Sequence, residues 1–117
     1  MSVPRRKTRL GSRRPDQAAP VFAALGDATR LALVKRLAGE DGLSIAELTA
    51  QTKVTRQAVT RHLEVLREAG LVRGEWSGRE HVWRLERARL ALARRSLDQI
   101  SGWWDERLST LKASVEG

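Results

Sequence analysis

The chain has 117 residues, enough for one domain with a modest core and too few for two. It contains no cysteine, which excludes disulfides, thiolate metal sites and cysteine nucleophiles. Twenty-two Lys and Arg against 14 Asp and Glu give a net charge of +8, which favours a polyanionic partner but is also common in ordinary soluble proteins. No apolar run approaches the roughly 18 residues that span a membrane. The basic N-terminus also lacks the apolar segment of a secretion signal, so we expect a cytoplasmic protein without a membrane partner.

Residues 1–17 are predicted to form a flexible basic arm. They hold six of the 22 basic residues and one acid, so about +5 of the net charge lies there. Charge runs of this kind are usually solvated tails. The rest of the chain is only mildly basic, and net charge alone does not identify its partner.

Two helices are expected at the start of the folded part. A first one is predicted around residues 20–26, because Pro20 is tolerated in a first helical turn and Gly26 can end it. Asp27 is a candidate N-cap for a second helix over residues 28–39. The apolar residues expected on its inward face are Leu31, Val34 and Leu37.

A pair of helices joined by a tight turn follows. Ser44 and Glu47 have the spacing of a capping box, in which each side chain bonds the backbone N–H of the other residue. A short turn over residues 52–54 leads to Thr55, a second candidate N-cap, and to a helix over residues 56–69.

A hairpin and a long helix complete the chain. Gly70 is expected to end the preceding helix in a left-handed conformation. Residues 71–85 are predicted to form a β-hairpin with its turn at Ser77–Gly78. From residue 86 to residue 115 only Gly102 interrupts a helical pattern.

The helix over residues 56–69 has two distinct faces. At 100° per residue, its apolar side chains fall on one arc of about 160°. These inward residues are Ala58, Val59, Leu63, Val65, Leu66 and Ala69. The outward side chains near its N-terminus are of the types that read base edges: Arg bonds guanine, Gln bonds adenine, and Thr contacts either base or a thymine methyl. The predicted base-reading residues are Arg56, Gln57, Thr60 and Arg61.

The order of these elements predicts a winged helix-turn-helix. A capped helix, a tight turn and a second helix with base-reading side chains in its first turns place that end in the major groove. Arg79, near the hairpin tip, would reach phosphate or the minor groove. The alternative, that Arg56 to Arg61 form only a solvated helix face, does not explain the order of elements. His62 falls within the apolar arc, so we expect it to be half-buried and hydrogen-bonded, with a DNA contact beside Arg61 as the alternative. His81, on the wing, could touch phosphate or have no contact.

Two sequence patterns carry a resemblance to a known family. They are F-x-A-L-x-D-x-T-R at residues 22–30 and T-R-H-L-x-V-L-R-E-A-G-L-V at residues 60–72. With them, residues 21–85 resemble the ArsR-type (ArsR/SmtB) winged-helix repressors of prokaryotes almost continuously, and the segment WWDERLSTLK resembles a branch with a Trp-bearing last helix. The resemblance implies a homodimer that binds an operator near a promoter. The residues that it and the pattern assign to backbone or wing contacts are Ser44, Lys53, Thr55, Arg79 and His81.

The chain departs from this family in two places. Lys53 stands where the family commonly has Gly, so it either holds a strained left-handed backbone or contacts phosphate, and both can be true. Metal-responsive members use Cys on the helix before the turn, or Asp, His and Glu on the last helix. The corresponding helix here has no Cys, and the last helix has no His, so neither a metal site nor another cofactor is expected.

The last helix is predicted to pair with a partner. Its apolar residues recur at spacings of mostly three and four, which a small domain cannot bury by itself. We therefore expect a homodimer through the terminal helices, with packing inside one chain as the alternative. Trp103 and Trp104 point about 100° apart, so one of them could line a pocket for a small apolar effector, although simple packing is commoner. The predicted interface residues are Leu97, Ile100, Trp104, Leu108 and Leu111.

These observations predict a mainly α chain with a small β-hairpin, organised as an arm (residues 1–17), a DNA-binding domain (18–85) and a dimerisation helix (86–117). The expected function is a sequence-specific regulator of transcription that represses at an operator near its own promoter. Alternatives are a sequence-indifferent architectural protein that binds DNA through the arm, and a winged-helix module that binds protein. An enzyme is the least supported class, because no paired carboxylates or glycine-rich phosphate loop are recognisable.

Overall fold

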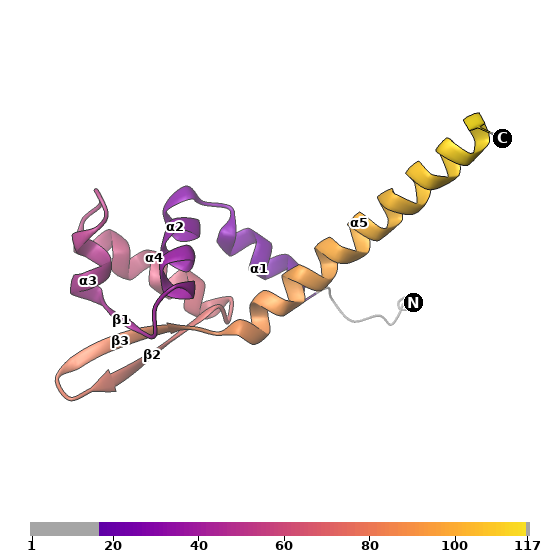
Figure 1. The fold of residues 1–117 in the computed structure, drawn as a ribbon. Coiled ribbons are helices and arrows are strands. Elements are labelled where there is room, and N and C mark those ends of the chain that lie inside the picture. The colour runs from indigo at the N-terminus through magenta and orange to yellow at the C-terminus, as the bar shows by residue number, and fades with distance from the viewer. Residues whose placement is uncertain (1–16, 117) are drawn as a thin grey trace, which may run out of the picture.

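The computed structural model describes residues 17–116, and this part of the chain is mainly helical with one small sheet (Figure 1). The fold class expected from the sequence is therefore confirmed, whereas the predicted basic arm lies almost wholly outside the described residues. In chain order the elements are α1 (Ala18–Leu25), α2 (Ala28–Ala38), β1 (Leu43–Ser44), α3 (Ile45–Ala50), α4 (Arg56–Glu68), β2 (Val72–Ser77), β3 (Glu80–Leu85) and α5 (Arg87–Glu116).

The predicted helix caps are confirmed. Asp27 Oδ2 accepts a hydrogen bond of 3.0 Å from the backbone N–H of Arg30, which begins α2. Ser44 and Glu47 form the complete capping box, with hydrogen bonds of 3.2 Å and 2.9 Å in the two directions. Thr55 caps α4 with its side-chain oxygen. Each cap satisfies backbone donors that the first turn of a helix leaves without a partner.

Helix α4 ends in a Schellman motif. The N–H of Gly70 donates to the carbonyl of Arg67, and the N–H of Leu71 donates to the carbonyl of Leu66, both at 2.9 Å. Gly70 has a φ of 79°, which a residue with a side chain adopts only with strain. The motif turns the chain directly from α4 into the hairpin.

The core is formed where α4 packs against α1, α2, α3 and the sheet. Two expected core positions are wrong: Leu31 is 39% exposed and Val65 is 37% exposed. A helix has 3.6 residues per turn, so residues spaced exactly three apart, as Leu31, Val34 and Leu37 are, do not stay on one face. The buried residues of α2 are Leu33, Val34 and Leu37. Val65 lies at the edge of the apolar arc of α4. The buried residues of α4 are Val59, Leu63 and Leu66.

The sheet contains one strand that the sequence did not predict. The two residues of β1 pair with β3, Leu43 opposite Trp83 and Ser44 opposite Val82, which gives the strand order β1-β3-β2. This pairing ties the start of α3 to the hairpin. The hairpin turn lies one residue later than expected, at Gly78 and the residue after it, because Ser77 still pairs within the ladder.

Helix α5 leaves the domain after its first turns (Figure 1). Its 30 residues span about 45 Å. Ala93 is buried and Leu90 is half-buried against the core, beside α1. Beyond them the helix projects without a neighbour among the described residues. None of the helices described combines the length and apolar character needed to cross a bilayer.

Candidate DNA-binding surface

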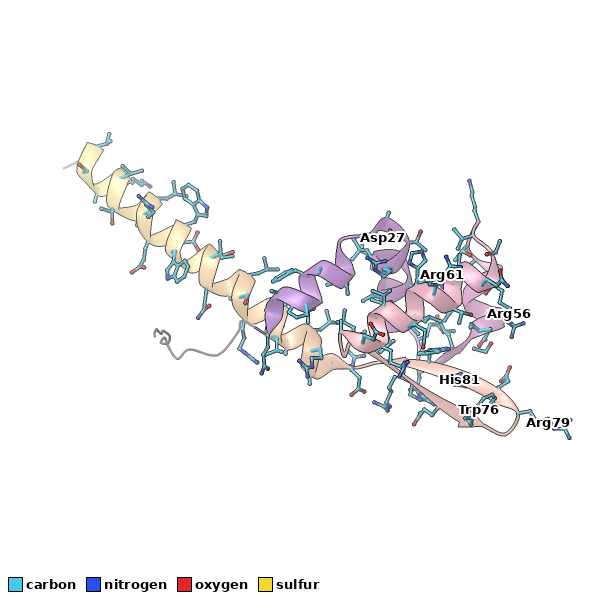
Figure 2. All side chains as sticks on the ribbon, turned by 180° about the vertical axis from the view of Figure 1, so that it is seen from behind. Asp27, Arg56, Arg61, Trp76, Arg79 and His81 are labelled. Atoms are coloured by element: carbon cyan, nitrogen blue, oxygen red, sulfur yellow. The ribbon has the colours of Figure 1, made fainter. Side chains whose placement is uncertain are left out.

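The four predicted base-reading residues lie together on α4. Arg56, Gln57, Thr60 and Arg61 line one hollow on the exposed face of the helix. They are two adjacent pairs one helical turn apart, which fall within an arc of about 140° at the N-terminal end. Figure 2 shows Arg56 and Arg61 along this helix. The arrangement presents charged and polar groups where a helix would enter a groove.

Free positive charge on α4 is concentrated at its N-terminal end. Among residues 17–116, neither Arg56 nor Arg61 has a carboxylate partner within salt-bridge distance. Further along, Arg67 bonds Glu64 through two hydrogen bonds, of 2.7 Å and 3.0 Å. That bond lowers the pKa of Glu64 below its ordinary value and raises the pKa of Arg67. The dipole of α4 adds partial positive charge at the same N-terminal end.

The two threonines at the start of α4 keep different hydrogen-bonding capacity. Thr60 donates its hydroxyl proton to the carbonyl of Arg56 at 2.9 Å, so its free oxygen lone pair and its methyl group remain for a base. Thr55 accepts from the backbone N–H of Ala58 at 3.1 Å and keeps its own proton, which a phosphate oxygen could accept.

Two other predicted backbone contacts differ in accessibility. Ser44 is only 5% exposed, and its hydroxyl oxygen serves the capping box of α3. Lys53 is exposed in the turn before α4. The structure gives Ser44 a folding role, and DNA contact by either residue stays a prediction.

The hairpin of β2 and β3 is the wing, and it carries both remaining predicted contacts. Arg79 is exposed in the turn, without an ion-pair partner within residues 17–116. His81 is half-buried, with its ring stacked on Trp76 at a centroid distance of 4.8 Å and tilted against Trp83, also at 4.8 Å. Figure 2 shows Trp76, Arg79 and His81 grouped near the outer end of the wing.

A second hollow, of about 360 Å³, lies between the wing and the helix-turn-helix. It joins residues of α3 and α4 to residues of the wing. The predicted contact residues among its lining are Ser44, Arg56, Thr60, Arg79 and His81. Trp76 also lines this hollow, although the sequence patterns did not point to it. The available signal was the alternation of the strand, which puts Trp76 on the same face as Val72 and Gly74 and leaves the polar residues Arg73, Glu75 and Ser77 on the other.

His62 belongs to the protein interior side of α4, as predicted. Its Nδ1 lies 3.3 Å from Arg30 Nη1 and 3.9 Å from Asp27 Oδ2. Arg30 also donates to the carbonyl of Ala24 at 2.6 Å, so it links the end of α1 to α4. The N–H of Arg30 and the nearby His62 and Arg30 side chains lower the pKa of Asp27 below its ordinary value.

The predicted dimerisation residues on α5 are accessible in the single chain. All five of them are between 49% and 60% exposed. The expectation of packing inside one chain thus holds only for the first turns of α5, near Ala93. The interface residues are Leu97, Ile100, Trp104, Leu108 and Leu111. Within the described residues, no group of three or more His, Asp or Glu side chains is close enough to hold a metal ion.

Comparison with known proteins gives consistent relatives. A helix-turn-helix domain family matches residues 25–75. The chain is 41% identical over 88 residues to the HTH-type transcriptional regulator Rv2034 of Mycobacterium tuberculosis, covering 75% of this chain and 78% of that protein. It is 38% identical over 76 residues to the HTH-type transcriptional repressor SmtB of the same species, covering 65% of this chain and 56% of that protein.

Solved structures share the fold. An ArsR-like transcriptional regulator from Rhodococcus sp. RHA1 has a TM-score of 0.69 and 38% identity, and the match covers 82% of this chain and 90% of that one. A homodimeric winged helix-turn-helix DNA-binding domain from Mycobacterium bovis has a TM-score of 0.60 at 24% identity, covering 74% and 79%. With the winged fold and the polar face of α4, these similarities show that the chain belongs to the ArsR-type family of winged helix-turn-helix, DNA-binding transcriptional regulators.

Proposed function

We propose that this regulator binds, as a homodimer, a specific operator near its own promoter and represses transcription there. The observation that carries the proposal is the hollow on α4 lined by Arg56, Gln57, Thr60 and Arg61. A set of base-reading side chains at the exposed N-terminal end of a recognition helix serves sequence-specific binding.

Each residue at this surface has a role that fits its bonding. Arg56 and Arg61 would donate to guanine, and Gln57 would bond an adenine edge. Thr60 would accept a hydrogen bond or contact a thymine methyl, since its proton is already donated within the helix. The phosphate contacts would come from Thr55, from Lys53 in the turn and from Arg79 on the wing, and they would set the register on the duplex.

The projecting part of α5 supports dimerisation. Its seam of large apolar side chains is half-exposed in the single chain, and a second copy of the same helix would cover it. The Mycobacterium bovis domain of the same fold is described as homodimeric. A dimer would place two recognition helices about one DNA turn apart, so the operator would be a pseudo-palindrome.

Repression would be steric. A dimer bound at an operator that overlaps a promoter occupies the DNA that RNA polymerase needs, so transcription from that promoter would fall. The protein would act in the cytoplasm. One mycobacterial relative is named a transcriptional repressor, which supports this direction of control.

A small apolar effector would act at the dimer seam. Trp103 is 63% exposed and points about 100° away from Trp104, which serves the seam. The two tryptophans, Ile100 and Arg107 line a mainly apolar hollow on α5. A ligand that filled it beside the partner helix would change the spacing of the recognition helices and so release the operator.

The test is binding of the purified protein to the DNA upstream of its own gene, compared with scrambled DNA of equal length at two salt concentrations. A preference of about a thousandfold or more would support a sequence-specific regulator. Equal, strongly salt-dependent binding to both duplexes would favour an architectural protein. Failure to bind either duplex at low salt would favour a protein-interaction module.

A further inference from the structure

Trp76 is a large aromatic residue exposed on the wing. Trp76 is 70% exposed. It is the second-last residue of β2 and lies three residues before Arg79 in the turn. Tryptophan combines a large apolar surface with few rotatable bonds, which suits it to binding surfaces. Contacts within the hairpin thus leave most of the Trp76 surface open to another partner.

The ring of Trp76 is held in place by two further rings. It stacks on His81 with an interplanar angle of 13°, and the ring of His81 in turn lies against Trp83 at an angle of 37°. Trp83 is 2% exposed and belongs to the core. These three residues, the aromatic ladder, thus run from the core to the surface of the wing. Fixing a side chain before binding reduces the entropy that association loses.

Gly74 makes room for the ladder. A Cβ atom at this position would lie 2.3 Å from His81 Nε2, closer than real contacts allow. Gly74 and Trp76 are two residues apart on β2 and so share one face, directly opposite Trp83 and His81 in the strand register. Glycine weakens a strand interior, so its presence here is explained by the close approach of the His81 ring.

The ladder faces the recognition helix. Trp76 and His81 line the same hollow as Arg56 and Thr60 of α4 and Arg79 of the wing. When a recognition helix occupies the major groove and a wing reaches the neighbouring backbone or minor groove, the sugar–phosphate strand between the two grooves passes between those elements. The hollow therefore offers that strand the guanidinium group of Arg79 for phosphate and the apolar ring of Trp76, and Glu80 adds one carboxylate to the same lining.

We propose that Trp76 is a DNA-contacting residue, whose exposed ring packs against a deoxyribose of the strand that passes between α4 and the wing. His81 and Gly74 are positioning residues for it. The inference rests on the proposed binding of DNA by α4 and the wing. An apolar contact to sugar releases no counterion and reads no base, so Trp76 adds affinity equally to all sequences and leaves the salt dependence unchanged.

The experiment compares Trp76→Ala and Trp76→Phe in the full chain. Binding is measured to the duplex upstream of the protein's own gene and to a scrambled duplex, at three salt concentrations. Trp76→Ala should bind both duplexes about tenfold more weakly, which is the low end of the loss seen when an aromatic residue that stacks on a base is removed. The slope of log affinity against log salt should equal that of wild type, and Trp76→Phe should retain most of the affinity.

Two controls separate this contact from charge and from folding. Arg79→Ala should reduce the salt slope by about one if Arg79 binds one phosphate, whereas Trp76→Ala should leave the slope unchanged. Gly74→Ala should weaken binding in the wild-type background but have little further effect in Trp76→Ala, because both changes remove the same interaction. Circular dichroism and sedimentation should show every variant folded and in the wild-type oligomeric state.

Three outcomes would overturn the inference. Wild-type affinity in Trp76→Ala would remove Trp76 from the interface and leave the proposed function intact. A reduced salt slope in Trp76→Ala would show that its effect passes through charge. Absence of binding by the wild-type protein to either duplex at low salt would overturn the proposed DNA-binding role, and the Trp76 contact with it.

Discussion

Arg56 and Arg67 lie on the same helix, but only Arg67 forms an ion pair within the described residues. Arg67 is bonded to Glu64, and Arg30, behind α4, is bonded to the carbonyl of Ala24 and to His62. Arg56 has no carboxylate partner within the part of the chain that the structure describes. An arginine without an internal ion pair has none to break when it bonds a base. Ion pairing therefore distinguishes the proposed base-reading residues of α4 from the arginines that hold the fold together.

Arg56→Ala should weaken binding to the operator by about 1–3 kcal/mol and relax the preference at one base position. Arg67→Ala is the matched control, because the same residue type is removed from the bonded end of the helix. It should bind the operator nearly as wild type does. Titration of operator variants with each protein checks both. Equal loss by Arg56→Ala on operator and scrambled DNA would instead identify Arg56 as a phosphate contact.

Asp27 should make the stability of the chain depend on acid pH. Its pKa lies below the ordinary value of 3.8, chiefly because the carboxylate accepts a hydrogen bond from the Arg30 backbone. A lowered pKa means that the charged form stabilises the folded state above pH 3.8, and that this contribution is lost as the pH falls through the folded-state pKa. Asp27→Asn keeps the cap but not the charge.

The measurement is urea unfolding of wild type and Asp27→Asn between pH 6 and pH 3. We expect the variant to be less stable at pH 6 and the gap to shrink below pH 3.8. Other carboxylates, including Glu47 in its capping box, titrate in both proteins and cancel in the difference. A gap that stays constant over this range would contradict the assignment of the charge effect to Asp27.

At the scale of whole elements, α4 and α5 are specified in different ways. Both ends of α4 are fixed by local hydrogen bonds, Thr55 at the start and the Gly70 motif at the end. Helix α5 is specified instead by a long repeat of apolar residues, and it has a glycine, Gly102, near its centre. Glycine lowers helix stability because the unfolded chain has more conformations to lose.

Gly102→Ala should raise the free energy of unfolding by up to about 1 kcal/mol. An added Cβ there meets nothing within 4 Å. Gly102 also lies on the face opposite Trp104, since two residues turn a helix by about 200°, and so away from the proposed seam. Thermal or urea unfolding measures the change. Loss of stability or of dimer would show that another backbone approaches α5 closely at this point.

At the scale of the whole molecule, the core ends near Ala93 and α5 continues beyond it. The seam on that projecting part is not covered by any other element within the described residues, and its five apolar side chains are all about half-exposed. Exposed apolar surface of this extent is typical of an interface. The proposed dimer would cover this surface and position the two recognition helices.

Leu108→Glu should produce a folded monomer, because Leu108 is 55% exposed in the single chain and would be buried only by a partner. Operator affinity should fall by more than tenfold, since one half-site replaces two. Ser109→Glu adds the same charge to the exposed face that Gly102 occupies, away from the seam, and should stay dimeric. Sedimentation and DNA titration test both variants, and a dimeric Leu108→Glu would place the interface elsewhere.

The local parts of this fold were predictable from the sequence. The capping residues, the Gly70 helix end and the polar face of α4 depend on residues three to five apart, whose relation is set by helix geometry. The two family patterns, at residues 22–30 and 60–72, are likewise short continuous stretches of sequence. The grouping of Arg56, Gln57, Thr60 and Arg61 follows from it, and the structure places these side chains together as expected.

Other features depended on contacts between distant parts of the chain. The strand β1 exists because Leu43 meets Trp83, 40 residues later, and two residues carry no strand pattern of their own. The exposure of Leu31 was decided by the direction in which α2 packs, and the link from α1 to α4 by the position of Arg30. The aromatic ladder that holds Trp76 likewise depends on the register in which β2 pairs with β3.

The sequence by itself determined which helices form and which face of α4 is polar, because those properties are periodic and local. Only the tertiary structure decided what the wing presents to α4, because that depends on strand pairing and on the space that Gly74 leaves for His81.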